Sequence, residues 1–269
     1  MKRSERLVDL THHLLENPYQ LIKLNFYMQR YNSSKSTISE DLEIVKKVFA
    51  EQGIGELATF PGAAGGLMFQ PTSSAAAIRD MAEDIKTLML EENRILPGGY
   101  IYLSDILGNP QHLRKIGKII AHEFADKRID AVMTIATKGI SIAQSVAEIL
   151  DIPFAVVRRT PKVTEGAMVN VNYMSGSSSK VENMTVSKRS LTIGQRVLIV
   201  DDFMKGGGTL NGIESLVHEL DCTVVGAAVF VEGPFSGVRP LTDYRSVLRV
   251  NNITLATHEI DVTLGNIFD

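Results

Sequence analysis

The first seventy residues carry two different periodicities of hydrophobic positions. Steps of three and four residues are typical of one buried face of a helix, and apolar runs around a glycine-rich turn are typical of a hairpin. The pattern predicts three helices, at about 4–16, 25–31 and 35–52, followed by strands at 57–60 and 67–69. These elements are in the order of a winged helix-turn-helix, whose last helix enters the major groove of DNA.

The pattern changes after residues 71–74, so the domains are expected to be 1–71 and 72–269. A long helix up to about residue 92 precedes continuous apolar segments that alternate with helical ones. Strands are predicted at 100–103, 131–135, 154–157, 196–200 and 223–231, with helices at 110–125, 140–150 and 210–220. This alternation predicts an α/β domain whose parallel sheet is covered on both faces and closes with the strand at 223–231.

Composition narrows the class of protein without identifying it. The chain has 269 residues, of which 44% are hydrophobic, and its 28 basic and 31 acidic residues leave a net charge of −3. This balance excludes a polybasic chain but permits a small basic DNA-binding face. The single cysteine, Cys222, excludes a disulfide framework. No signal peptide or membrane-spanning stretch is recognised, so we expect a cytoplasmic protein that does not enter membranes.

The most informative segment is residues 197–209, which read VLIVDDFMKGGGT. A buried strand ends in two adjacent carboxylates, and a glycine-rich turn then opens a helix. Glycine backbone N–H groups and a helix N-terminus attract anions. Two carboxylates beside such a turn fit vicinal hydroxyls or a Mg²⁺ ion shared with a polyphosphate. The segment therefore predicts a site for a phosphorylated ribose at the carboxyl edge of the sheet.

This segment resembles the phosphoribosyl pyrophosphate (PRPP) motif of type I phosphoribosyltransferases. The resemblance implies that Asp201 and Asp202 bind the ribose hydroxyls and that residues 205–209 bind the 5′-phosphate. Residues 135–141, IATKGIS, resemble the family's Lys-Gly turn that holds pyrophosphate. The expected effector site comprises Asp201, Asp202, Phe203, Lys205, Gly206, Gly207, Gly208, Thr209, Ala136, Thr137, Lys138, Gly139, Tyr102, Arg158 and Lys162.

One departure from the transferase pattern concerns Lys205. Purine phosphoribosyltransferases often carry an aspartate base there and a threonine at Gly206, whereas a lysine cannot take a proton from a nucleobase at neutral pH. We therefore assign no catalytic residue and expect a phosphoribosyltransferase fold without transferase activity. A xanthine- or guanine-type phosphoribosyltransferase with an accessory domain remains the alternative, because some xanthine enzymes also lack the aspartate.

With a winged helix in front, the whole chain resembles the purine operon regulators of Gram-positive bacteria. The resemblance implies a homodimer that binds a palindromic DNA operator and senses PRPP with Mg²⁺, and in some members a competing guanine nucleotide alarmone. An RNA-binding regulator built on the same domain is a third possibility. Residues 162–188 are expected to form a flap or hairpin that folds over bound polyphosphate.

DNA contacts are expected on the polar side of the third helix and at nearby cations. The residues are Lys35, Ser36, Thr37, Ser39 and Lys46, with Arg3, Arg6 and Lys23 as further phosphate contacts. A helix start with no acid before Glu40 also suits phosphate. A plain three-helix cap or dimerisation module with a solvated polar face explains the same pattern without DNA.

Overall fold

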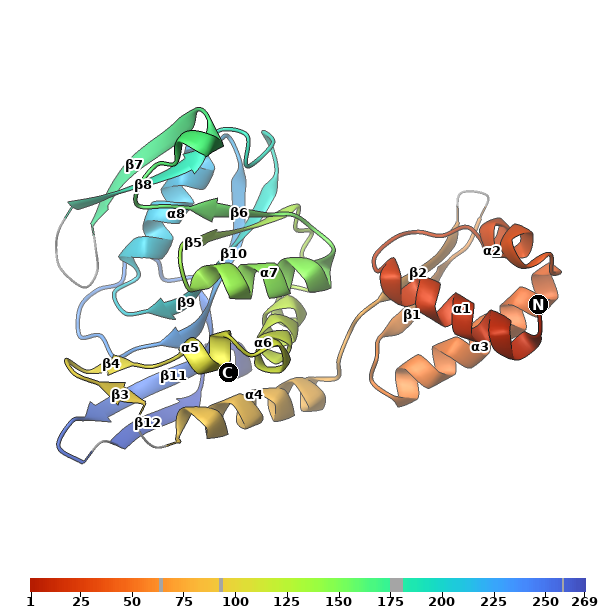
Figure 1. The fold of residues 1–269 in the computed structure, drawn as a ribbon, viewed down its shortest axis with the longest axis horizontal. Coiled ribbons are helices and arrows are strands. Elements are labelled where there is room, and N and C mark those ends of the chain that lie inside the picture. Colours follow the sequence, from red (N-terminus) through yellow and green to blue (C-terminus); the bar gives the residue numbers. More distant parts are fainter. Residues whose placement is uncertain (63–64, 92–93, 175–180, 258) are drawn as a thin grey trace. The chain divides into compact units, whose positions relative to one another are not determined.

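A computed structural model of the chain describes residues 1–62, 65–91, 94–174, 181–257 and 259–269. The chain divides into two compact units, and in the first half of the chain the break falls between Ala77 and Ile78 (Figure 1). Each unit has a hydrophobic core of its own. No helix in the described ranges is long and apolar enough to cross a membrane.

The first unit contains the three helices and the hairpin that the pattern predicts. They are α1 (Arg3–Glu16), α2 (Leu24–Tyr31), α3 (Lys35–Glu51), β1 (Glu56–Phe60) and β2 (Gly66–Gln70). The N-cap of α3 is Ser34, whose hydroxyl accepts a hydrogen bond from the Thr37 N–H at 3.3 Å. The apolar stripe of α3 is buried against Leu10, Tyr27 and Leu57, so the core lies between helices and hairpin.

A six-stranded sheet organises the second unit, with strand order β12-β11-β10-β9-β5-β6. Its strands are β5 (Ala131–Ile135), β6 (Phe154–Val157), β9 (Arg196–Met204), β10 (Thr223–Glu232), β11 (Arg245–Thr254) and β12 (Glu259–Leu264). All neighbours are parallel except β11 and β12. The parallel sheet is confirmed, but the expectation that it closes at β10 is wrong, because β11 and β12 extend this edge.

Two helices cover opposite faces at the middle of the sheet. They are α7 (Gly139–Leu150), between β5 and β6, and α8 (Gly208–Glu219), between β9 and β10. The connection from β5 to β6 moves toward one edge of the sheet, and the connection from β9 to β10 moves toward the other edge. Because both crossovers are right-handed, α7 and α8 lie on opposite faces. In agreement, Leu210 and Leu216 of α8 join the core cluster that contains Met133 and Ile199. The strand order therefore reverses between β5 and β9.

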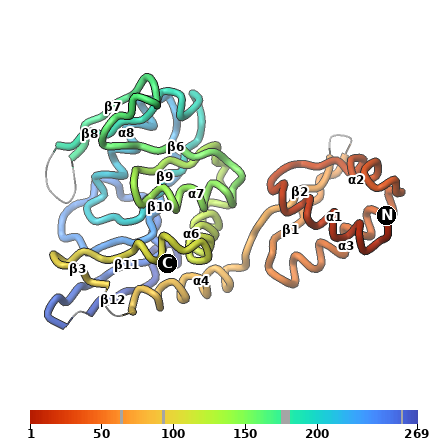
Figure 2. The backbone as a smooth tube through the Cα atoms, viewed as in Figure 1, coloured from red at the N-terminus to blue at the C-terminus, as the bar shows by residue number. Residues whose placement is uncertain are grey.

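Three helices and two small hairpins complete the second unit. The helices are α4 (Ala75–Met89), α5 (Ser104–Leu107) and α6 (Pro110–Glu123), and the hairpins pair β3 (Ile95–Leu96) with β4 (Tyr100–Ile101) and β7 (Met168–Met174) with β8 (Val181–Ser187). The predicted strand at 100–103 is thus only β4, outside the main sheet. The predicted hairpin is confirmed as β7 and β8. Near the C-terminus, the Phe268 ring lies 5.6 Å from the Arg79 guanidinium of α4. The backbone tube in Figure 2 shows the C-terminus beside α4 and α6.

Candidate functional site

The carboxyl edge of the sheet is hollowed where the strand order reverses. The turn at 136–138 follows β5, and the loop at 205–207 joins β9 to α8. A cavity of about 450 Å³ lies here. Its lining comprises Gly98, Gly99, Tyr100, Ile101, Leu103, Lys138, Arg159, Asp201, Asp202, Phe203, Met204, Lys205, Gly206, Gly207, Gly208, Thr209, Leu210, Pro234 and Ile253. Open α/β sheets bind ligands at such a switch point.

Two adjacent acids of β9 form one wall of the cavity. The Asp201 side chain is buried, and one of its oxygens accepts a hydrogen bond from the Asp202 N–H at 2.9 Å. Burial, and then the neighbouring Asp202 carboxylate, raise the pKa of Asp201 well above its ordinary value. The Arg159 guanidinium acts in the opposite direction on this pKa. The wall therefore offers carboxylate oxygens that lack a neutralising partner of matching strength.

A glycine loop lines the same cavity as the acids. Gly207 is the N-cap of α8 and has a φ of +77°, in the left-handed region that favours glycine. Gly206 and Gly208 are buried, whereas the Lys205 side chain is exposed. The first N–H groups of a helix have no intrahelical acceptors and point toward its N-terminus. The loop thus presents backbone donors and a partial positive charge to an anion.

The turn after β5 brings a cation and a glycine to the acids. Lys138 lines the cavity, and the peptide bond between Ala136 and Thr137 is cis. At Gly139 an added Cβ would lie 2.9 Å from an Asp201 carboxylate oxygen and would overlap the Thr134 hydroxyl. Only a residue without a side chain lets α7 begin this close to Asp201.

Arg159 lines the cavity together with Lys138 and Lys205, and it is one of two neighbouring arginines after β6 that the sequence offers as pyrophosphate contacts. Adjacent residues of an extended segment face opposite sides. Arg158 extends β6 through a bridge to Thr185 and donates to Glu165 at 2.8 Å, whereas Arg159 faces the cavity. Of these two arginines, the structure brings Arg159 to the cavity lining and turns Arg158 away from it. The alternation of side chains along β6, continued past Val157, is the sequence signal that distinguishes Arg158 from Arg159.

Several other predicted effector residues do not line the cavity. Ala136 and Thr137 belong to the turn that holds Lys138, and Gly139 is the first residue of α7. Tyr102 is exposed and absent from the lining, whereas Tyr100 of β4 is among the lining residues. Lys162 is exposed at the start of a short 3₁₀ helix, Val163–Glu165.

The β7–β8 hairpin packs against α8 and contacts one cation of the site, Arg159. The Tyr173 hydroxyl donates to a Glu182 carboxylate oxygen at 2.7 Å, and the Glu182 carboxylate also pairs with the Arg159 guanidinium at 3.4 Å. Burial and the bond to Glu182 raise the pKa of Tyr173 to about 12. The stretch 176–179, expected to act in flap closure, lies outside the described residues.

In the first unit a groove of about 460 Å³ runs between α3 and the hairpin. Its lining includes four of the predicted DNA contacts, namely Lys23, Lys35, Ser39 and Lys46. Ser36 is exposed in the first turn of α3, and Thr37 is half-buried through its bond to Ser34. The groove therefore joins the polar face of α3 to the strands of the hairpin.

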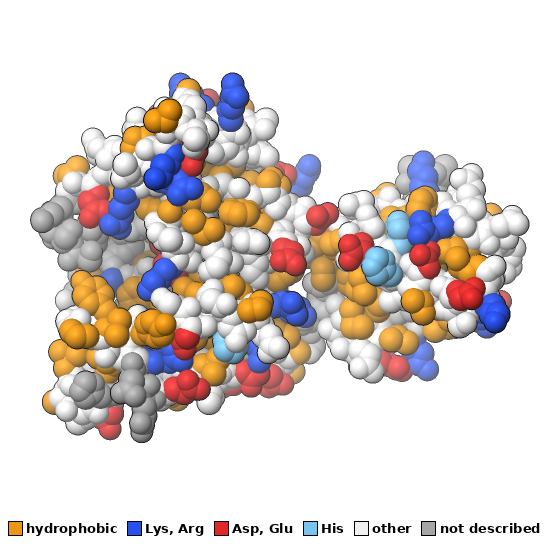
Figure 3. Space-filling view, viewed as in Figure 1, with side chains coloured by type: hydrophobic (Ala, Val, Ile, Leu, Met, Phe, Trp, Pro, Cys, Tyr) orange, Lys and Arg blue, Asp and Glu red, His pale blue; other side chains and the backbone are white. Residues whose placement is uncertain are grey.

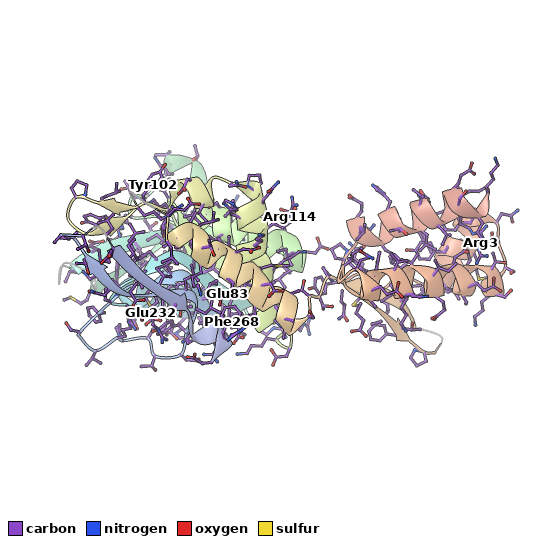
Figure 4. The ribbon with its side chains drawn as sticks, turned by 90° about the horizontal axis from the view of Figure 1, so that it is seen from below. Arg3, Glu83, Tyr102, Arg114, Glu232 and Phe268 are labelled. Atoms are coloured by element: carbon purple, nitrogen blue, oxygen red, sulfur yellow. The ribbon has the colours of Figure 1, made fainter. Side chains whose placement is uncertain are left out.

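Two predicted phosphate contacts have a different role in the structure. Arg6 is buried, and its Nε donates to Asp41 of α3 at 2.5 Å. The Arg3 Nε donates to the other Asp41 oxygen at 3.0 Å, and Figure 4 shows Arg3 on the helical side of this unit. Asp41 has no solvent exposure, so it requires these cations. The prediction for Arg6 is wrong for this reason, and Arg3 is engaged rather than free.

A second groove of the first unit, between α1 and α3, is apolar. It measures about 440 Å³, and its exposed members include Val8, Leu15, Ile44 and Val48. Figure 3 shows hydrophobic side chains over these helices. The two grooves thus differ in chemistry, and only the one beside the hairpin carries cations.

Comparison with known proteins gives matches for both units and for the whole chain. The family model for the N-terminal part of the bacterial purine repressor matches residues 2–71, and that for the phosphoribosyl transferase domain matches residues 103–262. A purine biosynthesis transcriptional activator, PurR, of Lactococcus lactis subsp. lactis (strain IL1403) is 63% identical over 100% of this chain and 99% of its own.

Two further matches cover the chain to different extents. A purine biosynthesis transcriptional repressor, PurR, of Bacillus subtilis (strain 168) is 47% identical over 98% of this chain and 93% of its own. The crystal structure of adenine phosphoribosyltransferase from Thermoanaerobacter pseudethanolicus superposes with a TM-score of 0.54 at 22% identity, over 62% of this chain and 99% of that one. The latter likeness shows the fold of the second unit alone.

Proposed function

The chain belongs to the PurR family of bacterial purine biosynthesis regulators, and from this premise we propose that it binds an operator through its first unit and PRPP through its second. The chemistry of each site supports one half of this proposal. A lysine-bearing groove lies in the first unit, and in the second a diacid and a glycine loop line one cavity. The proposal makes PRPP a signal that sets the transcription of purine genes.

On the DNA side, α3 is the element that enters the major groove. Lys35, Ser36 and Ser39 are exposed near its N-terminus, where the residues of a recognition helix reach base edges. Lys23 and Lys46 flank the same groove and contact phosphates, and the β1–β2 hairpin follows the backbone as a wing. A homodimer repeats this unit on the two halves of a palindromic operator.

On the ligand side, one observation carries the proposal. The buried diacid of Asp201 and Asp202 lies in one cavity with the Lys138 turn and the loop at 205–209. PRPP has vicinal ribose hydroxyls between a pyrophosphate and a 5′-phosphate. The diacid accepts bonds from the hydroxyls, Lys138 and Arg159 hold the pyrophosphate, and the loop N–H groups hold the 5′-phosphate.

The site also fits a Mg²⁺ ion that accompanies the polyphosphate. Asp201 and Asp202 supply hard carboxylate oxygens, while the described residues contain no group of three acids, histidines or cysteines that would form a protein-only metal site. Mg²⁺ characteristically takes one or two carboxylates and completes its shell with phosphate oxygens and water. The ion would neutralise charge between the diacid and the pyrophosphate.

Lys205 supports the proposal that the chain binds PRPP without transferring its phosphoribosyl group to a base. An ammonium group at this position cannot act as the base for an incoming purine. A guanine nucleotide alarmone that carries a pyrophosphate would compete for the same cations. Turnover of PRPP with xanthine or guanine would contradict this proposal and show that the chain is a phosphoribosyltransferase.

Calorimetry of PRPP binding with Mg²⁺ tests the ligand half. The Asp201→Asn/Asp202→Asn double variant should lose binding while its thermal unfolding remains cooperative. Asp130→Asn is the matched control, because Asp130 precedes β5 at the opposite edge of the sheet. Unchanged affinity in the double variant would exclude the diacid from the site.

Operator titration over a range of salt concentrations tests the DNA half. Lys35→Ala and Lys46→Ala should each lower the slope of log K against log salt by about one unit, because each substitution removes one cation from the phosphate backbone. Lys47→Ala is the control on the same helix, since Lys47 pairs with Glu51 at 3.7 Å and does not line the groove. Equal slopes for all three variants and the unaltered chain would rule out the groove as the DNA site.

Operator titration with and without saturating PRPP tests the link between the units. A typical coupling is about 1–3 kcal/mol, or roughly 5–150-fold in operator affinity, and must be reciprocal. The diacid double variant should keep its basal operator affinity and lose the response. Identical isotherms for the unaltered chain would show that PRPP does not regulate DNA binding.

A further inference from the structure

The segment after β10 turns back over the glycine loop, and Arg239 connects the two. Its Nε donates to the Lys205 carbonyl at 3.0 Å, and its Nη2 donates to the Gly233 carbonyl at 3.0 Å. Gly233 in turn donates from its own N–H to the Met204 carbonyl at 2.8 Å. One guanidinium therefore ties the end of β9 and the start of the loop to the end of β10.

Other side chains hold this guanidinium in place. Its Nη1 donates to a Glu232 carboxylate oxygen at 2.5 Å and to the Tyr244 hydroxyl at 2.7 Å. The Tyr244 hydroxyl then donates to the same Glu232 oxygen at 2.8 Å. The guanidinium carbon also lies 5.6 Å from the centre of the Tyr244 ring and 5.9 Å from that of Phe235. Arg239 thus has little freedom to move away from the loop.

The anion that anchors Arg239 is an internal carboxylate of the second unit. Glu232 is buried at the end of β10, and Figure 4 places it inside this unit. Its second oxygen accepts from the Ser246 hydroxyl at 3.0 Å and from Arg249 at 3.3 Å. Burial opposes ionisation, but the bonds from Tyr244 and Arg239 outweigh it and lower the pKa of Glu232. Neither Glu232 nor Arg239 lines the cavity, so this network supports the loop from behind.

The contact with Arg239 fixes one peptide plane of the loop. In a trans peptide the C=O and N–H bonds point in opposite directions. Holding the Lys205 carbonyl toward Arg239 therefore turns the Gly206 N–H away from it. Gly206 is buried and lines the cavity, and its N–H takes part in no hydrogen bond within the described residues. A buried donor without an acceptor is unfavourable unless a ligand or water supplies one.

We infer that Arg239 is a positioning residue, which orients the Gly206 N–H toward the 5′-phosphate of the bound ligand and acts without touching that ligand. This inference rests on the proposed PRPP site and adds a residue that sets its affinity from outside. Arginine suits the task because its planar donors reach four acceptors at once, whereas lysine offers a single compact group. The pyrophosphate cations Lys138 and Arg159 lie on other elements and should not respond to Arg239.

Calorimetry with two probes on the full chain separates positioning from general stability. Arg239→Gln should weaken PRPP binding by about 10- to 100-fold, the size expected for the removal of one charge-assisted bond. Its affinity for inorganic pyrophosphate with Mg²⁺ should change less than about twofold, because that probe lacks a 5′-phosphate. Arg239→Lys should recover only part of the PRPP affinity.

Arg249→Gln is the matched control, because Arg249 also bonds Glu232 but has no bond to the loop. It should leave both probes unchanged. Unchanged PRPP affinity in Arg239→Gln would overturn the inference. An equal loss of affinity for PRPP and for pyrophosphate would also overturn it, because such a loss indicates a structural defect.

Amide hydrogen exchange of the ligand-free chain gives a readout independent of PRPP. Arg239→Gln should accelerate exchange at residues 205–207 and leave the interior of β9 as protected as before. Should the unaltered chain fail to bind PRPP, the proposed function is refuted, while unchanged exchange in the variant separately refutes the positioning role.

Discussion

Each unit of the chain contains one deeply buried aspartate, and the two have opposite surroundings. Asp41 on α3 has no exposure, and each of its oxygens accepts a bond from a guanidinium, that of Arg3 or that of Arg6. Asp201 on β9 is 4% exposed, takes part in no ion pair within the described ranges, and has the like-charged Asp202 beside it. Burial alone therefore does not identify a functional acid.

The difference separates a carboxylate that stabilises the fold from one that is costly to it. A buried ion pair with both partners present is tolerated, and losing one partner leaves an uncompensated charge. A buried acid whose pKa is raised destabilises the folded state once it ionises. Perturbed acids of this second kind gather at functional sites. Under the proposed function, the hydroxyl donors of PRPP and its Mg²⁺ ion would be the partners that compensate Asp201.

The largest expected effect follows from removing a partner of Asp41. Arg6→Ala should lower the unfolding free energy of the first unit by about 3–5 kcal/mol, because Asp41 remains buried with one of its two guanidinium partners removed. Scanning calorimetry of the full chain measures this loss as a lower midpoint temperature of the unfolding transition of the first unit. Arg30→Ala is the control, since the exposed pair of Arg30 and Asp9 is worth about 1 kcal/mol or less.

A double substitution checks the reason for that loss. Arg6→Met with Asp41→Leu replaces the pair by apolar groups, and should restore most of the stability. A loss below about 1 kcal/mol in Arg6→Ala would show that Asp41 is not the strongly compensated group described above.

The next effect concerns the space beside Asp201. Gly139→Ala places a methyl group against the Asp201 carboxylate and the Thr134 hydroxyl, and overpacking of this kind typically costs about 1–3 kcal/mol. Alanine at a helix position should otherwise gain up to about 1 kcal/mol, so a net loss comes from the contact. The free energy of unfolding, measured in urea, and the PRPP affinity, measured by calorimetry, should both fall. A variant as stable as the unaltered chain, with full PRPP affinity, would show that α7 can move away from β9.

The spacing of hydrophobic residues was enough to predict those elements whose buried face follows directly from that spacing. The stripe of α3 and the continuous apolar run of β9 are both buried as expected. The diacid and the glycine loop were also predictable, since consecutive residues after a buried strand must lie at its carboxyl end. The proposed ligand, in contrast, came from the resemblance to a known motif.

Long-range pairing is what local pattern could not provide. Arg6 and Asp41 are 35 residues apart and both stand among polar positions, so the sequence assigned Arg6 to the surface. β11 and β12 were missed because their burial depends on neighbouring strands, and several of their residues are polar or exposed. Which of Arg158 and Arg159 faces the cavity depended on one bridge between Arg158 and Thr185. Arg239 carries no motif at all, since its partners come from three separate segments.

A smaller effect, of opposite sign, is expected at Asp201 itself. Its folded pKa is raised, so between the ordinary aspartate pKa and the raised value the folded state binds more protons than the unfolded state. Stability should therefore fall as pH rises through this window. Asp201→Asn removes that dependence and should raise the Tm at neutral pH, by about 2–4 °C for each kcal/mol gained, while PRPP binding is lost. A lower Tm in this variant at every pH would show that Asp201 is well compensated.

The smallest effect belongs to an aspartate that has a partner but lies near the surface. Asp130 accepts from Arg196 at 2.8 Å and 2.7 Å, and the bonds to Arg196 lower the pKa of Asp130 to about 2. A fully expressed shift of this size would correspond to about 2.6 kcal/mol. The Asp130 side chain is 26% exposed, so solvent screens the pair and about 1 kcal/mol or less is expected.

That contribution has a defined pH dependence, opposite to the one at Asp201. A lowered folded pKa gives stability that is present above the ordinary aspartate pKa and is lost as pH falls toward about 2. Asp130→Asn should therefore differ from the unaltered chain by at most about 1 kcal/mol at pH 7, with the difference shrinking below about pH 5. Urea unfolding at several pH values measures both quantities. A loss as large as that of Arg6→Ala would mean that pairing, rather than burial, sets the energetic weight of these acids.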